Sequence, residues 1–149
     1  MTNATTDAGT TLRVSRTYPI ARERVFAAWL DAGTLRRFFA PRDITVGEVT
    51  TDPRPGGAYS VVMNTAQGPW TVRGTYVEIT RPERIVFTWA WDEDDPADAH
   101  ESQVTIDFHD RGGATELVLT HERLRDTGSR DGHRDGWIAV LENLDGALS

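Results

Sequence analysis

The 149-residue sequence predicts an α+β fold, in which an antiparallel sheet packs against one long C-terminal helix. Two observations support this class. Residues 128–149 repeat apolar side chains at three-, four- and seven-residue steps, which gathers them on one face of a helix. Residues 44–121 contain short stretches of alternating apolar and polar side chains separated by tight turns, which is typical of antiparallel strands. The apolar face of the sheet therefore offers the surface that the helix needs.

The chain before this region is predicted to contribute one strand and two short helices. Residues 1–11 have almost no apolar content, so we expect a disordered tail and a single domain over 12–149. Alternation over 12–18 predicts the first strand. Helical spacing of apolar side chains then predicts two short helices, one over 22–30 and one over 34–39.

Six further strands bring the predicted sheet to about seven. They are expected over residues 44–50, 59–63, 70–79, 85–91, 104–108 and 117–121. The apolar parity shifts after Tyr76, which predicts a bulge there. In the last hairpin, a two-residue loop at Gly112-Gly113 would set Val104 opposite His121. This register places His121 on the apolar face of the sheet.

The first half of the C-terminal segment contains three glycines: Gly128, Gly132 and Gly136. Each glycine in a helix costs about 1 kcal/mol relative to alanine, so these positions need an explanation. Three explanations keep the segment helical: close approach of the backbone to the sheet, space for a ligand, or a loose helical entrance that admits one. The alternative is that the helix begins only near Asp135 and that residues 128–134 form a loop.

Composition narrows the classes of function. The net charge of −7, from 23 acidic and 16 basic residues, opposes contact with phosphate backbones, so no nucleic-acid partner is expected. The absence of cysteine excludes disulfides and thiolate metal sites and fits a cytoplasmic location. No signal-peptide pattern and no apolar run near eighteen residues is present, so neither secretion nor a membrane span is expected.

Neither a metal site nor a cofactor site is expected. The acidic stretch over 92–99 lacks the glycine and closing glutamate of a calcium loop, so we interpret it as a solvated hairpin tip. His121-Glu122 lacks the second histidine of an H-E-x-x-H zinc motif. No nucleophile elbow or glycine-rich phosphate loop is recognisable, and no residue is assigned a catalytic role.

Several aromatic side chains, one methionine and two histidines are candidates for lining a cavity between helix and sheet. These are Trp29, Tyr59, Met63, Trp70, Trp89, Trp91, Trp137, His121 and His133. For any single ring or histidine, the alternative is an ordinary core position. As a group the rings favour a cavity, because polar-tipped rings in a tight core need partners for their N–H or O–H groups. If both histidines face that cavity, they could bind a polar ligand group or act as acid and base.

Several segments, in order, resemble the activator-of-heat-shock-protein-90-ATPase homologue-like family, within the START-like (SRPBCC, Bet v-like) group. The resemblance covers Leu12 to Leu148. Its main motifs are Phe38-Phe39-Ala40-Pro41, Asp52-Pro53-Arg54-Pro55-Gly56-Gly57, the run from Glu78 to Thr88, Thr120-His121 and Gly136-Trp137. The family usually carries tryptophan at the first or both of the Phe38 and Phe39 positions. The departure keeps aromatic rings at these two candidate ligand-binding positions and alters the shape of the cavity.

The resemblance implies a helix-grip fold, in which a curved sheet wraps around the C-terminal helix and leaves a cavity for apolar ligands. Members of the wider group bind lipids, polyketides, hormones or antibiotics, and some cyclise or dehydrate them. The chain resembles the isolated single-domain bacterial type, without the additional domain through which a full co-chaperone grips its chaperone. We therefore expect a soluble cytoplasmic protein, monomeric or homodimeric, that binds a small hydrophobic or aromatic ligand. The alternatives are a cyclase or dehydratase that uses a cavity histidine, and a chaperone ATPase activator that acts through its surface.

Overall fold

The computed structural model describes residues 3–41, 44–92 and 100–148. Its elements in chain order are β1 (Ala4–Ala8), β2 (Thr11–Tyr18), α1 (Arg22–Ala28), α2 (Ala32–Phe38), β3 (Thr45–Thr51), β4 (Ala58–Thr65), β5 (Gly68–Thr80), β6 (Arg84–Trp91), β7 (Ser102–Asp110), β8 (Thr115–Glu122) and α3 (Thr127–Ala147). The predicted acidic hairpin tip lies outside the described residues, apart from its first residue, Asp92.

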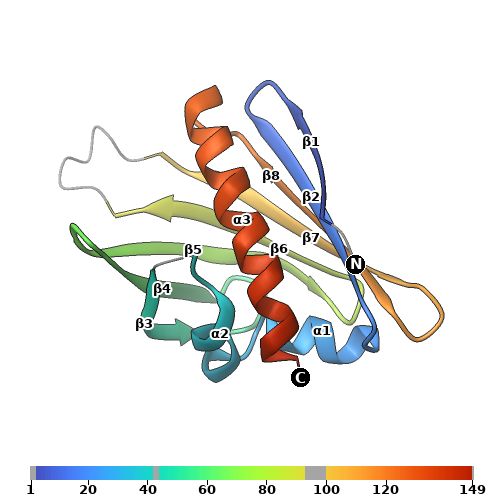
Figure 1. The fold of residues 1–149 in the computed structure, drawn as a ribbon. Helices are drawn as coiled ribbons and strands as arrows, with labels where there is room; N and C mark the ends of the chain where they lie inside the picture. Colours follow the sequence, from blue (N-terminus) through green and yellow to red (C-terminus); the bar gives the residue numbers. More distant parts are fainter. Residues whose placement is uncertain (1–2, 42–43, 93–99, 149) are drawn as a thin grey trace.

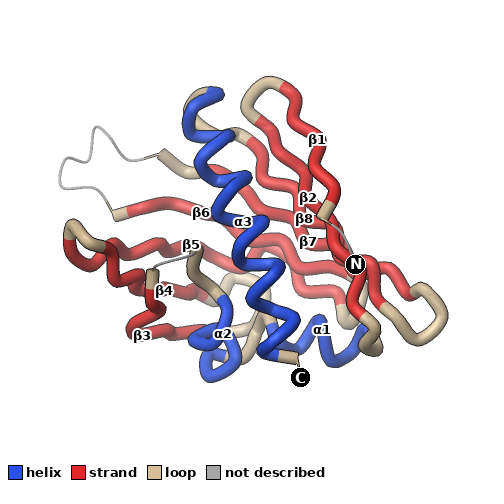
Figure 2. Tube along the Cα trace, viewed as in Figure 1, coloured by secondary structure: helices blue, strands red, loops and turns tan. Residues whose placement is uncertain are grey.

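The strands form one antiparallel sheet in the order β1-β2-β8-β7-β6-β5-β4-β3. All seven predicted strands are present, and β1 adds an eighth at the edge. Figure 1 shows α3 lying across the concave face of the curved sheet, with α1 and α2 near the C-terminal end of α3. The same arrangement is visible in Figure 2, where the single long helix crosses strands drawn in red. The predicted α+β helix-grip fold is confirmed.

Strand registers also agree with the sequence pattern. Val104 pairs with His121 across β7 and β8, so His121 faces the apolar side as expected. In β5 the register with β6 shifts between Tyr76 and Glu78, which is the predicted bulge. The bulge lets the long strand β5 bend, because the extra residue on one strand increases the local twist.

The prediction of a disordered tail over 1–11 is wrong for Ala4–Ala8, which forms β1 and pairs with β2. Its backbone continues the sheet, and its side chains contact the polar side of α3. Asp7 accepts a hydrogen bond from Arg134 Nη1 at 2.7 Å and lies 4.0 Å from Arg130 Nε. Backbone pairing and ion pairs therefore hold this strand. Neither interaction needs apolar side chains, so the low apolar content of this segment did not reveal the strand.

Helix α3 begins at Thr127, so the alternative of a start near Asp135 is wrong. The side chain of Asp126 accepts a hydrogen bond from the backbone N–H of Ser129 at 2.7 Å. This N-cap satisfies one of the unpaired N–H groups of the first turn and fixes where the helix starts. None of the described helices is long and apolar enough to span a bilayer.

The core lies between α3 and the sheet. Leu141 and Leu144 of α3 are fully buried, and burial of each such side chain contributes about 1.5–3 kcal/mol. Tyr18 of β2 donates a hydrogen bond from its hydroxyl to the carbonyl oxygen of Leu141 at 2.7 Å. An ion pair between Arg16 and Asp145 links the same strand and helix nearby. Packing and polar contacts together fix the C-terminal half of α3 on the sheet.

Candidate functional site

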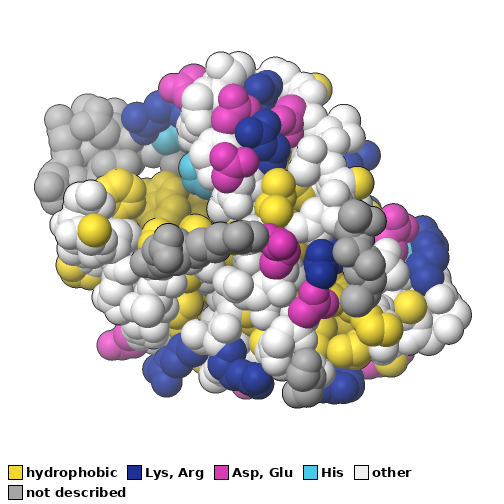
Figure 3. All heavy atoms as spheres, in the orientation of Figure 1, with side chains coloured by type: hydrophobic (Ala, Val, Ile, Leu, Met, Phe, Trp, Pro, Cys, Tyr) yellow, Lys and Arg dark blue, Asp and Glu magenta, His cyan; other side chains and the backbone are white. Residues whose placement is uncertain are grey.

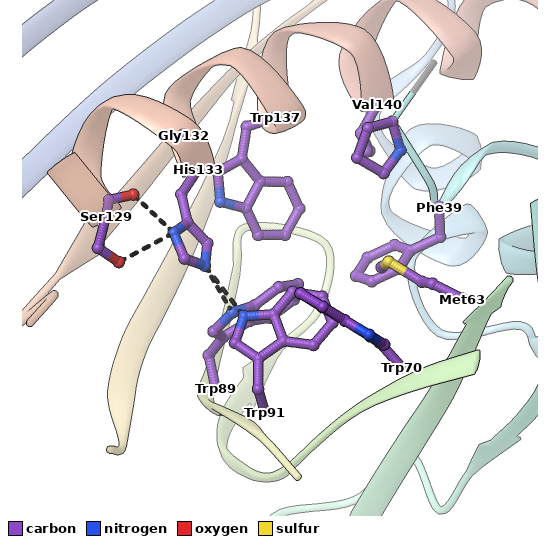
Figure 4. A pocket seen from close by; sticks show the side chains of 12 residues that line it. Phe39, Met63, Trp70, Trp89, Trp91, Ser129, Gly132, His133, Trp137 and Val140 are labelled. Carbon is purple, nitrogen blue, oxygen red and sulfur yellow. Dashed lines mark hydrogen bonds between the residues drawn. The ribbon is translucent and has the colours of Figure 1, made fainter. Parts of the chain in front are cut away.

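A cavity of about 270 Å³ lies between the N-terminal half of α3 and strands β4 to β6. Seven of the predicted ligand-binding residues line it: Phe39, Met63, Trp70, Trp89, Trp91, His133 and Trp137. Figure 4 shows their side chains converging from the helix above and the strands below. In Figure 3 the space-filling surface is hollowed here, with hydrophobic side chains inside and histidine at the edge. The sheet and the helix thus enclose a largely apolar space.

Five further lining residues were not among the predicted set: Pro41, Ser129, Gly132, Gly136 and Val140. The sequence did point to the two glycines, because glycine is costly in a helix and both lie at the border of the apolar helix face. A Cβ added at Gly132 would meet no atom within 4 Å, and one at Gly136 would reach only Pro41, at 3.4 Å. Close approach to the sheet therefore does not explain these glycines. They leave open space beside the helix, and Pro41 and Ser129 gave no comparable signal.

The other four predicted residues lie outside this cavity. Trp29 and Tyr59 line a separate cavity of about 20 Å³, and Tyr59 donates a hydrogen bond from its hydroxyl to the carbonyl oxygen of Thr88 at 2.6 Å. Phe38 is 1% exposed and packs edge-on against Trp29, with ring centroids 5.2 Å apart. His121 is fully buried beneath the cavity wall.

Trp89 is the central ring of the cavity wall. Its centroid lies 4.9 Å from that of Trp137, 5.6 Å from that of Trp91 and 6.0 Å from that of Phe39. Tilted and edge-on contacts at these distances are favourable, because the positive ring edges meet the negative faces. Trp70 is different: it is 55% exposed and contacts the edge of Trp91 from the outside. The cavity therefore has a buried aromatic floor and an exposed aromatic rim.

His133 is the main polar group of the wall. Its Nδ1 lies 2.7 Å from the carbonyl oxygen of Ser129, which can only accept, so Nδ1 carries the proton. Its Nε2 accepts hydrogen bonds from the indole N–H groups of Trp89 and Trp91, at 3.3 and 3.2 Å. Burial lowers the pKa of His133 below its ordinary value of 6.5, while the hydrogen bond to Ser129 raises it in part. The imidazole is thus held neutral, with a defined tautomer.

His121 has the opposite tautomer. Its Nδ1 accepts from the indole N–H of Trp137 at 3.0 Å, so its Nε2 carries the proton and donates to Ser102 Oγ at 2.7 Å. Ser102 in turn donates to the carbonyl oxygen of Trp89 at 3.2 Å. Burial, and then the neighbouring His133, lower the pKa of His121 well below 6.5. This is a satisfied core histidine, although its two hydrogen-bond partners are side chains and not the backbone.

A second cavity, of about 250 Å³, adjoins the first across the wall formed by Trp89, Trp91 and His133. Its other lining groups are more polar and include Arg125 and His100. Among the described residues, no cluster of three or more histidine, cysteine or acidic side chains is placed to hold a metal ion. The arrangement is therefore suited to binding an apolar body with one polar group at its inner end.

Comparison with known proteins agrees with this architecture. The sequence model of the family described as Activator of Hsp90 ATPase homolog 1-like protein matches residues 19–149. The crystal structure of the AHSA1 protein from Silicibacter pomeroyi is 30% identical, with a TM-score of 0.81 over 93% of this chain and 96% of that one. A protein from Chromobacterium violaceum is 25% identical, with a TM-score of 0.84 over the same shares, 93% and 96%. CalU16 from Micromonospora echinospora, 20% identical, has the same fold, with a TM-score of 0.71 over 99% of this chain and 85% of that one. Among curated proteins, no match to this chain was found.

Proposed function

This chain belongs to the family of Activator of Hsp90 ATPase homolog 1-like proteins, and we propose that it binds a small, mostly apolar molecule. The observation that carries the proposal is the cavity of about 270 Å³ beside α3. Ligand pockets combine mostly apolar walls with a few polar groups that fix orientation. Here Ser129 and His133 are the polar groups in a wall of aromatic and aliphatic side chains.

The size of the cavity limits the ligand. Pockets for drug-sized molecules usually measure about 300–1,000 Å³, so a slightly smaller one suits a ligand of about two fused rings. Such a body would bury about 250 Å² of apolar surface, as a tryptophan side chain does. At about 25 cal/mol per Å² this burial contributes about 6 kcal/mol. This contribution alone corresponds to a dissociation constant of about 40 µM. Because association also costs rigid-body freedom, we expect dissociation constants weaker than this value.

Titration with indane and with octan-1-ol tests the proposal. Four of the five tryptophans line the cavity, so their indole N–H signals in ¹H–¹⁵N NMR spectra report ligand entry. We expect saturable shifts for Trp89, Trp91 and Trp137 and the smallest shift for Trp29, which lies outside the cavity. If neither compound produces saturable shifts, the proposal is wrong.

A matched pair of variants locates the binding. Gly132→Leu adds a side chain at the cavity wall, where an added Cβ meets no atom within 4 Å. We expect it to weaken indane binding at least about tenfold, or about 1.4 kcal/mol. Gly146→Leu makes the same change at the far end of α3, where an added Cβ also meets nothing within 4 Å, and should leave binding unchanged. Equal weakening by both variants would place the ligand elsewhere.

The two alternative functions have less support in the geometry. Acid–base catalysis by two cavity histidines needs ring nitrogens on both that a ligand can reach, but both ring nitrogens of His121 are hydrogen-bonded within the core, so only His133 of the two faces the cavity. A chaperone partner needs a contiguous exposed apolar patch. Among the described residues, the exposed large hydrophobic side chains are Trp70 and Val77, and Trp70 belongs to the cavity rim. Ligand binding therefore explains more of the molecule.

A further inference from the structure

At the inner wall of the cavity, hydrogen-bond donors outnumber acceptors. Trp89 and Trp91 each aim an indole N–H at the same atom, His133 Nε2, at 3.3 and 3.2 Å. A neutral imidazole has a single lone pair on this nitrogen, so two donors share one acceptor. The distances of 3.3 and 3.2 Å lie at or just beyond the upper end of the range of about 2.7–3.2 Å for N–H···O hydrogen bonds. The wall therefore presents two donors and one acceptor that do not satisfy one another fully.

Resting on the proposed function, we propose that the ligand is a hydroxylated aromatic molecule whose phenolic oxygen lies among Trp89, Trp91 and His133. A hydroxyl group carries one donor and two acceptor lone pairs. Its O–H donates to His133 Nε2, and its two lone pairs accept the two indole N–H groups. One oxygen atom thereby gives each of these three groups its own partner.

Other polar groups fit this wall less well. A carbonyl or ether oxygen accepts the two indole N–H groups but leaves the lone pair of His133 without a donor, which is unfavourable for a buried acceptor. A hydrocarbon offers no hydrogen bond, so the two indole N–H groups continue to share His133 Nε2. The tautomer of His133 is set in advance by its 2.7 Å hydrogen bond to the carbonyl oxygen of Ser129, so Nε2 is available as an acceptor. The wall is thus organised to accept a proton donor at this point.

The same three side chains also fix where the rest of the ligand lies. They separate the apolar cavity from the adjoining cavity of about 250 Å³, so the hydroxyl oxygen sits at the junction of the two. The aromatic body then extends into the apolar cavity, towards Phe39 and Trp137. Flat rings suit this space because tilted and edge-on contacts with the surrounding indoles are favourable.

Four ligands with the same bicyclic body test the proposal: indane, 5-indanol, 5-methoxyindane and indane-5-carbaldehyde. Calorimetric titration should show 5-indanol binding about tenfold more tightly than each of the others. Equal affinity for the alcohol and the aldehyde would mean that an acceptor suffices, which overturns the donation to His133. Equal affinity for all four would overturn the hydroxyl proposal and leave the proposed function intact. If none of the four binds, the proposed function itself fails.

Two variants then assign the preference to the indole groups. Trp91→Phe keeps an aromatic ring and removes one N–H, so the preference for 5-indanol over indane should fall to about threefold or less. Trp70→Phe makes the same change at the rim of the same cavity and should retain the tenfold preference. Each preference is a ratio measured on one variant, so a change in overall stability does not alter it. An unchanged preference in Trp91→Phe overturns the proposed position of the hydroxyl.

Discussion

The two halves of α3 lie on the same sheet but meet it differently. In the C-terminal half, Leu141 and Leu144 are fully buried and leave no exposed apolar surface. In the N-terminal half, Gly132, His133 and Gly136 line a cavity instead. Trp137 lies between the two regions, 3% exposed, and contributes to both the core and the cavity wall. One continuous helix thus serves as a core element at one end and as a pocket wall at the other.

Side-chain volume on the helix makes this difference. Close packing in the C-terminal half follows from leucines that fill the space above the sheet, as expected for a protein interior. In the N-terminal half the glycines provide no side-chain volume, and the indoles of β6 are hydrogen-bonded to His133 at the wall of the cavity. Substitutions in the C-terminal half should therefore change mainly stability, and substitutions in the N-terminal half should change mainly ligand binding.

The largest effect on stability is expected from truncation in the packed half. Leu141→Ala should lower the free energy of unfolding by about 2–5 kcal/mol, because it removes buried methyl groups and leaves a void. Urea denaturation measures this change, and indane binding to the folded variant should be unaffected. Trp137→Ala should destabilise by about 3–5 kcal/mol and also abolish indane binding. A loss below about 1 kcal/mol for either would contradict the described packing.

Lowering the pH should destabilise the protein through the two buried histidines. Their pKa values are lowered in the folded protein, so the unfolded chain binds more protons as the pH falls below 6.5. The stability contribution is complete above pH 6.5 and is lost towards the folded-state pKa values. Each histidine contributes up to about 1.4 kcal/mol per pH unit.

The variant His133→Gln isolates one of these protons. Urea denaturation at several pH values, from about neutral downward, measures how the free energy of unfolding changes with pH. This dependence should be shallower for the variant than for the unmodified protein. The slope that remains in the variant includes the contribution of His121, whose pKa is lowered mainly by burial. Identical slopes would mean that His133 is not held neutral by the fold.

A smaller, stabilising effect is expected from Gly132→Ala. The added Cβ meets no atom within 4 Å, so the helix gains about 1 kcal/mol of propensity without a clash. Gly146→Ala, in the last turn of α3, should stabilise less, because helix ends fray. Thermal unfolding distinguishes the two. Destabilisation by Gly132→Ala would indicate that the helix is not regular at this position.

The smallest effect on stability is expected from Trp70→Ala. The ring is 55% exposed and packs against Trp91 alone among the aromatic rings described, so its removal should cost about 0.5 kcal/mol. Binding of indane should weaken more clearly, by about threefold, because the rim of the cavity is opened. A stability loss as large as that of Leu141→Ala would show that the ring belongs to the core.

Periodicity alone predicted much of this molecule. The helical spacing of Trp137, Leu141 and Leu144 predicted the buried face of α3. Strand alternation, with a two-residue loop at Gly112-Gly113, predicted the pairing of Val104 with His121. Both features depend on local geometry, which repeats along the chain. The start of α3 is also encoded locally, because Asp126 is a typical N-cap residue three positions before Ser129.

Other features depend on groups far apart in the sequence. Strand β1 is held by backbone pairing and by Asp7 contacting Arg134, neither of which apolar patterning reports. The sequence placed both histidines inward, yet only the fold separates them: His121 is sealed in the core, whereas His133 lines the cavity.

The amino-acid sequence by itself therefore determined the architecture, since periods of two and 3.6 residues decide which side chains face the core. Tertiary structure decided which of the inward rings surround a cavity, because that depends on the volumes of residues brought together from α3, β4, β5 and β6. It also decided the hydrogen-bond partners of the two histidines. The tautomer of His121 is set by the indole of Trp137, which packing supplies from another element. The tautomer of His133 is set within α3 by the carbonyl oxygen of Ser129, four residues earlier, and packing adds the indoles of Trp89 and Trp91 at its other nitrogen.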